Sequence, residues 1–260
     1  MDNFLVLLAL GLGAGVFSGL FGIGGGIVIV PALTLLLAFD TKTAVATSLA
    51  ALLLPVGIFA VLEYRRKGLL DIRASAWVAF GLVLTTIIGA EITLALPAAL
   101  FKQAYGVFVI IMGLRFLGVF NRGKPAAPIR DDADTSGTPW WGLFALGLAA
   151  GVLSGMFGIG GGIVIVPALV GFFGFPHKRA VGSSLGALLL PVGLLGVLRY
   201  AAAGTLDVLD AAPVAIGLAV GALGGARIAI GLSAAHMKQL YGAFLVVVGI
   251  WFVIQPYVGV

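Results

Sequence analysis

Residues 21–33 of the chain read FGIGGGIVIVPAL, and residues 157–169 read FGIGGGIVIVPAL again. The second copy begins 136 positions after the first, and thirteen identical residues in a row indicate an internal duplication. Each copy carries three consecutive glycines within an apolar run, at 24–26 and at 160–162. Because glycine destabilises a helix interior and tolerates sharp turns of the backbone, each run predicts a break between two helices.

A helix is predicted to resume directly after each glycine run, through Ile27–Val30 in the first copy. The N-terminus of such a helix has unpaired N–H groups and a dipole charge of about +0.5, which together favour an anion. We therefore expect the two turns to face each other within a membrane and to hold an anionic substrate. The backbone positions predicted to contact it are Gly24, Gly25, Gly26, Gly160, Gly161 and Gly162.

The composition places these turns in a membrane protein. Hydrophobic residues make up 61% of the chain and charged residues 10%, whereas soluble domains carry about 25% charged residues. The 40 glycines suit closely packed membrane helices. We assign the net charge of +5 to loop residues beside anionic lipid, not to nucleic-acid binding. With no cysteine, the chain has no disulfide, thiolate nucleophile or cysteine metal site.

Apolar segments recur with the same offset in both halves. In the first repeat, residues 1–120, they cover 4–20, 27–38, 43–63, 75–96 and 100–119. In the second repeat, residues 140–260, they cover 140–156, 163–174, 179–199, 211–232 and 236–254. The polar stretch 121–139 between the repeats is interpreted as a flexible cytoplasmic linker.

Segment length suggests how each repeat crosses the membrane. A span needs about 20 residues, which the last three segments of a repeat supply. Segment 27–38 is too short and 4–20 is borderline, so we interpret this pair as a helical hairpin that turns back at the glycines. The alternative merges both into one broken span. The predicted fold is an all-α polytopic membrane protein with two inverted-topology repeats, each a glycine-broken hairpin plus three transmembrane helices.

Loop charges favour inversion over parallel repeats. With the basic loop 63–73 in the cytoplasm, inverted repeats leave three of thirteen loop cations outside, whereas parallel repeats leave five. The inner set is Arg65, Arg66, Lys67, Arg73, Arg122, Lys124, Arg130, Lys178, Arg179 and Lys238, and the outer set is Lys42, Lys102 and Arg199. Both termini are then expected outside the cytoplasm.

Two copies of a G-x-G-G-G turn, each followed by an apolar run, a proline and a T/S-S-L helix, resemble the TauE/SafE sulfite exporter family. The matching residues are Gly22–Pro31 with Thr47–Leu49, and Gly158–Pro167 with Ser183–Leu185. The resemblance covers nearly the whole chain. It implies transport of sulfite or organosulfonate anions, usually outward, with a substrate that differs among members.

Hydroxyl side chains near the turns are further candidates for the site. Thr47, Ser48, Ser183 and Ser184 lie early in the segments at 43–63 and 179–199. Each hydroxyl either bonds within or between helices or donates to anion oxygens. The same two readings apply to Ser18 and Ser154, just before the turns.

Charged residues within the apolar segments need a partner or a role, because a charge at mid-membrane costs about 2.5–3.5 kcal/mol. Arg227 and Glu91 occupy equivalent positions, but inverted repeats would separate them in depth by roughly 20 Å. Arg227 is therefore predicted to attract anions on the cytoplasmic side or to be paired structurally. Glu91 is expected to reach the outer surface or to carry a proton. Asp71 and Asp207 are predicted helix N-caps.

These patterns predict a secondary carrier for a small anion in a bacterial inner membrane, with no cofactor, and the family resemblance implies that the anion contains sulfur and is exported. An anion channel would use the same turns but keep a continuous pore, and a structural membrane subunit would leave the buried turns unexplained. An enzyme is not predicted, because the chain has no cysteine and its two histidines, His177 and His236, are single and far apart in sequence, so they form no nucleophile–base pair or metal cluster. The anion, the coupling ion and the oligomeric state stay open.

Overall fold

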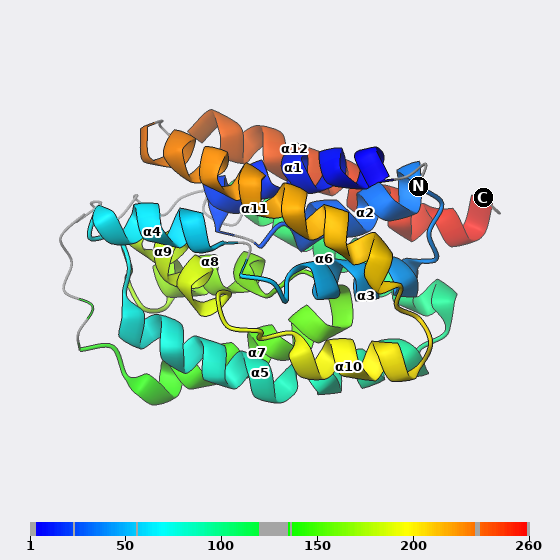
Figure 1. The fold of residues 1–260 in the computed structure, drawn as a ribbon, viewed down its shortest axis with the longest axis horizontal. Helices are drawn as coiled ribbons and strands as arrows, with labels where there is room; N and C mark the ends of the chain where they lie inside the picture. Colours follow the sequence, from blue (N-terminus) through cyan, green and yellow to red (C-terminus); the bar gives the residue numbers. More distant parts are fainter. Residues whose placement is uncertain are drawn as a thin grey trace. The chain divides into compact units, whose positions relative to one another are not determined.

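The computed structural model describes residues 4–22, 24–55, 57–119, 135, 137–231 and 235–258 (Figure 1). Within these ranges the chain is helical and contains no strand, which confirms the predicted all-α class. The first repeat forms α1 (Phe4–Phe21), α2 (Gly26–Leu36), α3 (Thr41–Ala51), α4 (Ile58–Arg66), α5 (Ile72–Ala95) and α6 (Ala98–Phe116). The second forms α7 (Trp140–Phe157), α8 (Gly162–Gly171), α9 (His177–Ala187), α10 (Leu194–Ala202), α11 (Val208–Gly231) and α12 (Ala235–Val258).

The helices form two compact units that do not coincide with the two repeats. The larger unit contains α1–α5 and α7–α11, and the smaller unit contains α6 and α12. Each repeat therefore contributes helices to both units. The predicted linker at 121–139 lies mostly outside the described residues, so the division at 120 and 139 stays a prediction.

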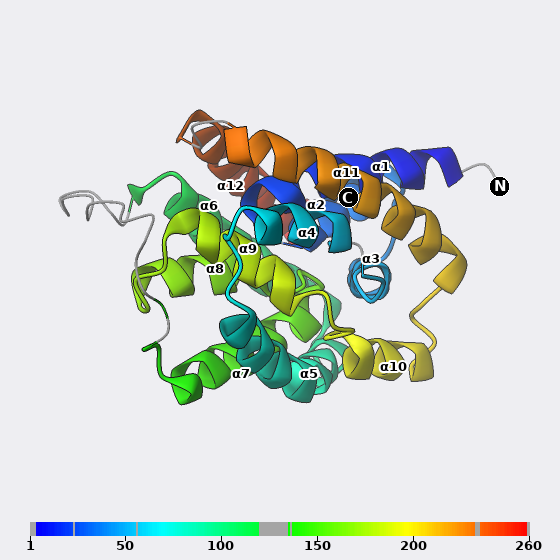
Figure 2. The same ribbon diagram turned by 60° about the vertical axis from the view of Figure 1, so that its left-hand side comes forward.

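Within the larger unit, two pairs of long helices pack side by side, α1 with α11 and α5 with α7 (Figures 1 and 2). Glycines let the backbones approach closely. In the first pair, Gly11, Gly15 and Gly19 lie against Val214, Leu218 and Ala222. In the second, Gly147, Gly151 and Gly155 lie against Val78, Leu82 and Thr86. Residue numbers rise together in both pairs, so each pair is parallel, and the duplication is reproduced in the packing.

Within the smaller unit, α6 and α12 pack antiparallel. A Cβ on Gly106 would lie 2.6 Å from the carbonyl oxygen of Gly249, and one on Gly113 would lie 2.8 Å from that of Gly242. The partner's number falls as the residue number rises, so the two helices run in opposite directions. The rings of Tyr105 and Phe252 pack with centroids 4.8 Å apart and planes tilted by 48°.

The segments at 43–63 and 179–199 differ from the expectation of continuous spans. The first is divided into α3 and α4, and the second into α9 and α10. Pro55 and Pro191 lie in the two breaks. Proline lacks the N–H that a helix interior requires and clashes with the preceding turn, which explains both interruptions. Each repeat therefore contains two broken helical segments, one at glycines and one at a proline.

Among the described residues, five helices are long and apolar enough to cross a membrane: α1, α5, α6, α7 and α11. Segment 4–20, judged borderline from the sequence, thus corresponds to a helix of 18 residues. Helices α2 and α8, with 11 and 10 residues, are shorter, as predicted for the part after each glycine turn.

The predicted N-caps are confirmed. Asp71 Oδ1 accepts a hydrogen bond from the Ala74 N–H at 2.9 Å, at the start of α5. Asp207 Oδ1 accepts one from the Leu209 N–H at 2.8 Å, at the start of α11. These carboxylates satisfy N–H groups that the first helical turn leaves unpaired.

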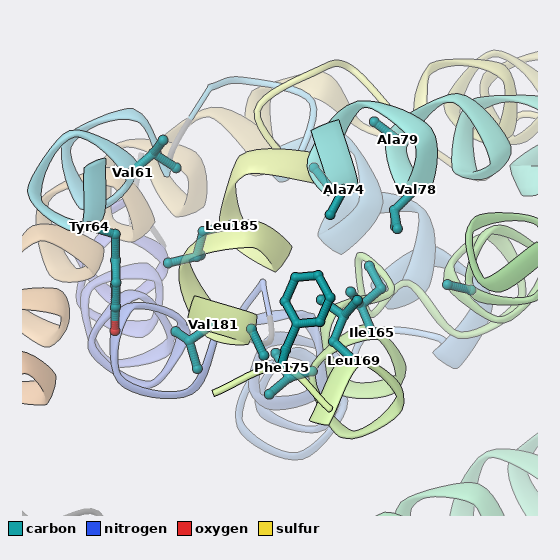
Figure 3. Packing of buried hydrophobic residues seen from close by; sticks show 14 of the residues in the cluster. Val61, Tyr64, Ala74, Val78, Ala79, Ile165, Leu169, Phe175, Val181 and Leu185 are labelled. Carbon is teal, nitrogen blue, oxygen red and sulfur yellow. The ribbon is translucent and has the colours of Figure 1, made fainter. Parts of the chain in front are cut away.

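A buried apolar cluster joins the short helices to the long ones. Figure 3 shows Tyr64 of α4, Val181 of α9, Ile165 of α8 and Val78 of α5, all with at most 1% of their surface exposed. The cluster draws on both repeats, so the two repeats share one core in the larger unit.

Candidate functional site

The two glycine turns have the same backbone conformation. In the first turn, Gly22, Gly24 and Gly25 have φ of 68°, 79° and 83°. Their equivalents in the second turn, Gly158, Gly160 and Gly161, have φ of 67°, 72° and 83°. Residues that carry a side chain rarely adopt this left-handed backbone conformation, so glycine is required for the shape of both turns.

Each turn brings the chain back along the helix that precedes it. Gly25 is placed so that a Cβ would lie 3.1 Å from the carbonyl oxygen of Ala14, about two helical turns before the end of α1. Gly25 is the N-cap of α2, and its carbonyl oxygen accepts from the Val28 N–H at 3.0 Å. Having no side chain, it caps none of the first N–H groups of α2. Gly161 has the same role at the start of α8.

The two turns lie against each other inside the larger unit. A Cβ on Gly26 would overlap the carbonyl oxygen of Gly158. One on Gly24 would lie 3.3 Å from the Ile159 carbonyl oxygen and 3.7 Å from Gly160 Cα. The structure therefore brings Gly24 and Gly26 of the first turn against residues 158–160 of the second, although the turns are far apart in sequence, whereas Gly25 and Gly161 face Ala14 and Ala150 of the preceding helices.

Ser48 and Ser184 each form a hydrogen bond to the glycine turn of the other repeat. Ser48 Oγ donates to the carbonyl oxygen of Gly158 at 2.7 Å, and Ser184 Oγ donates to that of Gly22 at 2.8 Å. Each hydroxyl has one proton, so neither can donate to an anion while these bonds are made. In this arrangement the two serines position the turns. Ser183 Oγ accepts from the Asp71 N–H at 2.9 Å.

Thr47 and Ser154 differ from these serines, because their hydroxyls are buried and unpaired. Both residues are 0% exposed, and neither hydroxyl has a hydrogen-bond partner among the described residues. Thr47 precedes Ser48, which bonds Gly158, and the Ser154 carbonyl oxygen accepts from the Gly158 N–H at 2.8 Å. Two unpaired hydroxyls therefore belong to the segments that hold the second glycine turn. A buried polar group without a partner is uncommon and suggests a site for a ligand or ion.

Two buried tyrosines, which the sequence showed only as equivalent positions, also support the turns. Tyr64 OH donates to the Gly19 carbonyl oxygen at 3.3 Å, linking α4 to α1. Tyr200 OH donates to the Gly155 carbonyl oxygen at 2.9 Å, linking α10 to α7. Neither tyrosine lies near a glycine run in sequence, so only the fold identifies them.

Two ion pairs between helices have exchanged polarity. Arg199 of α10 makes a two-pronged contact with Glu91 of α5, in which Nη2 lies 3.2 Å from Oε2. Arg227 Nε of α11 lies 3.7 Å from Glu63 Oε1 of α4. Position 199 is the equivalent of 63, and 227 is the equivalent of 91, so the acidic and basic partners are exchanged between the pairs.

Arg227 is thus a predicted site residue that the structure does not place at the glycine turns. Its side chain is 64% exposed and contacts Glu63, so it has a partner that the sequence did not identify. Glu91 likewise has a partner, Arg199. The pairing of carboxylates with guanidinium groups depends on which helices become neighbours. The spacing of residues along the chain does not reveal these neighbours.

Broken helices from two repeats that meet at paired turns, in a chain with several membrane-spanning helices, define a multi-pass membrane transporter. The chain matches the family model for Sulfite exporter TauE/SafE over residues 7–252 and belongs to that family. Three similar proteins are each called a probable membrane transporter protein. YunE of Bacillus subtilis is 32% identical over 72% of this chain and 75% of its own length.

The other two relatives are matched over nearly their full lengths. The one from Methanocaldococcus jannaschii is 28% identical over 96% of both chains. The one from Xylella fastidiosa strain 9a5c is 28% identical over 96% of this chain and 95% of its own length. No solved structure matches the chain.

Proposed function

We propose that the protein is a secondary carrier that exports sulfite or a small organosulfonate anion across the cell membrane. The carrying observation is that two buried, unpaired hydroxyls, those of Thr47 and Ser154, belong to the segments that bond Gly158 of the second glycine turn. An anion held there would accept from both hydroxyls and from the first N–H groups of α8. The names of the relatives support transport, and the family description supports a sulfur-containing anion.

Packing around the turns favours a carrier over a channel. Leu52 Cδ1 and Leu188 Cδ1 lie so close that Cβ atoms on Gly160 and Gly24 would be 3.0 Å and 3.1 Å away, respectively. Side chains therefore cover both turns, and transport would require these leucines to move. A channel would instead keep the turns continuously open to water.

The antiparallel packing of α6 and α12 supports inverted repeats. These helices are equivalent under the duplication, so parallel repeats would make them cross the membrane in the same direction. Inverted repeats make them cross in opposite directions, which agrees with their antiparallel glycine contacts. The binding site between such repeats would lie near the middle of the membrane.

Labelling of equivalent loop positions tests this topology. In the cysteine-free chain, Lys67→Cys and Ala203→Cys place single thiols at exposed, equivalent positions. We expect the first to react only in inverted vesicles, which expose the cytoplasmic side. The second should react only in intact cells, which expose the outside. Reaction of both from one side would show that the repeats are parallel.

The unpaired hydroxyls allow binding to be separated from folding. Thr47→Val and Ser154→Ala should leave the free energy of unfolding unchanged or raise it by about 1–3 kcal/mol, because each removes a buried polar group that has no partner. Both should weaken apparent substrate affinity. Ser48→Ala is the matched control: it leaves Gly158 without its partner and should lower stability by about 1 kcal/mol. Normal transport by both Thr47→Val and Ser154→Ala would exclude the site.

Transport itself is tested by uptake of radiolabelled sulfite and sulfoacetate into proteoliposomes, with and without a pH gradient. A carrier should show saturable uptake and counterflow, in which unlabelled anion inside accelerates entry of label. Uptake without saturation or counterflow would indicate a channel, and no uptake of either anion would contradict the proposed substrate class.

A further inference from the structure

The duplication allows each helix to be compared with an equivalent helix of the same chain. Helices α4 (Ile58–Arg66) and α10 (Leu194–Ala202) are such a pair, each following the proline break of its repeat. Their ion pairs and tyrosines are also equivalent. Differences in how the two helices are held therefore reflect residues that changed after the duplication.

Helix α10 is held tightly. Thr86 Oγ1 of α5 donates to the Val192 carbonyl oxygen, just before α10, at 3.2 Å. Tyr200 OH bonds Gly155 at 2.9 Å, and Arg199 makes a two-pronged ion pair with Glu91. A Cβ on Gly193 would lie only 2.9 Å from Leu49 Cδ1, so α10 begins in close contact with α3.

Helix α4 has fewer and longer polar attachments than α10, although Tyr64 packs closely against α9, where a Cβ on Gly182 would lie 3.1 Å from Tyr64 Cβ. Alanine stands at 222, the equivalent of Thr86, and has no hydroxyl to donate. Tyr64 OH lies 3.3 Å from its acceptor, and Glu63 is 3.7 Å from Arg227 and 3.8 Å from Arg66. A Cβ on Gly57 would have its nearest neighbour 3.9 Å away.

A cavity of about 370 Å³ lies against α4, within the usual range of about 300–1,000 Å³ for small-molecule sites. It is lined by Ile58, Val61, Leu62, Arg65, Leu70, Ile72, Ser75, Gly186 and Leu189. Three of these contribute polarity or space: Arg65, Ser75 and Gly186. A Cβ on Gly186 would lie 2.6 Å from Ser75 Oγ, so glycine is needed to accommodate the serine, whose hydroxyl lies within hydrogen-bond distance of the Asp71 and Ser183 carbonyl oxygens.

The equivalent positions in the other repeat lack all three features. Ala201, Ala211 and Ala50 stand where Arg65, Ser75 and Gly186 stand in the cavity. The cationic side chain, the hydroxyl and the missing Cβ therefore occur together on the side of α4. This is the side of the basic loop that follows α4, with Arg66 and Lys67, which the positive-inside rule places in the cytoplasm.

We propose that this cavity is the cytoplasmic entry chamber for the anion, that Arg65 selects for negative charge there, and that α4 is its mobile cover. The inference rests on the proposed anion transport, because it assigns the chamber to the path of that substrate. Loose attachment allows α4 to move while α10 stays closed on the opposite side. If α4 opens more readily than α10, the anion is loaded mainly from the cytoplasm, as export requires.

Thiol reactivity at equivalent positions tests the chamber. Ser75→Cys lines the cavity, and Ala211→Cys is its equivalent in the other repeat. The full-length protein in nanodiscs would be treated with sulfonatoethyl methanethiosulfonate, an anion, and with its trimethylammonium analogue. We expect Ser75→Cys to react roughly tenfold faster with the anion than with the cation, and faster than Ala211→Cys does.

Two matched variants assign that preference to Arg65. Adding Arg65→Gln to Ser75→Cys should abolish the preference for the anionic reagent, whereas adding Arg66→Gln should leave it, because Arg66 does not line the cavity. Equal rates at Ser75→Cys and Ala211→Cys, or a preference that survives Arg65→Gln, would overturn the proposal.

Hydrogen exchange of the unmodified protein tests the cover without any substitution. Backbone amides of α4 should exchange roughly tenfold faster than those of α10, because α4 has fewer and longer attachments. Equal or slower exchange in α4 would refute its role as the mobile cover. Neither measurement records transport, so failure of sulfite or sulfoacetate uptake would refute the substrate class while leaving the chamber and cover standing.

Discussion

Gly26→Ala is expected to abolish transport. The added methyl group would overlap the carbonyl oxygen of Gly158 and approach Ile159 Cα to 2.7 Å, at the point where the two glycine turns meet. These are backbone atoms, which cannot move aside as the end of a flexible side chain can. Overpacking of this kind costs about 1–3 kcal/mol, and the turns can relieve it only by separating. Transport in proteoliposomes and thermal unfolding would be measured on the same preparation.

Gly13→Ala is the matched control. Gly13 lies in α1, and a Cβ there would have no neighbour within 4 Å. Its equivalent in the second repeat is already Ala149, so the fold accepts a methyl group at this position. We expect Gly13→Ala to transport normally. Equal activity of Gly26→Ala and Gly13→Ala would show that contact between the turns is unnecessary for transport.

Glu91→Arg is expected to remove most of the transport activity, and the double variant Glu91→Arg/Arg199→Glu is expected to recover it. The single change places two guanidinium groups together in the link between α5 and α10. The double change restores opposite charges with exchanged polarity. That polarity already exists at the equivalent link, where Glu63 of α4 meets Arg227 of α11.

Initial transport rates per amount of folded protein, with melting temperatures, would measure both effects. Arg199→Glu alone serves as the second single variant and should resemble Glu91→Arg. A double variant no more active than either single variant would mean that these residues act separately and that the ion pair does not link the helices functionally.

Much of the fold could be predicted because the signals are local. Three consecutive glycines in an apolar run predict a break between two helices, and both copies contain one, with left-handed backbone at the first two of the three glycines. Asp71 and Asp207 cap the helices that follow them, because capping involves only neighbouring residues. The breaks at Pro55 and Pro191 were also visible as prolines, but apolar content over 43–63 and 179–199 outweighed them in the prediction of continuous spans.

The site was predicted less completely, because its chemistry depends on contacts across the repeats. Thr47 and Ser48 are adjacent hydroxyl residues that the sequence cannot distinguish. In the structure Ser48 donates its proton to Gly158, whereas Thr47 has no partner among the described residues. The sequence placed Arg227 among possible anion contacts, but the approach of α4 to α11 gives it Glu63 as a partner.

By itself, the sequence determined the duplication, the membrane class, the position of both turns and the family resemblance, since repetition, hydropathy and glycine conformation are properties of the chain. Only the tertiary structure decided which turn residues touch, which hydroxyls have partners and which helix is held loosely. Those depend on which helices become neighbours, and the duplication makes the difference plain: equivalent residues such as Tyr64 and Tyr200 make bonds of 3.3 Å and 2.9 Å because their surroundings differ.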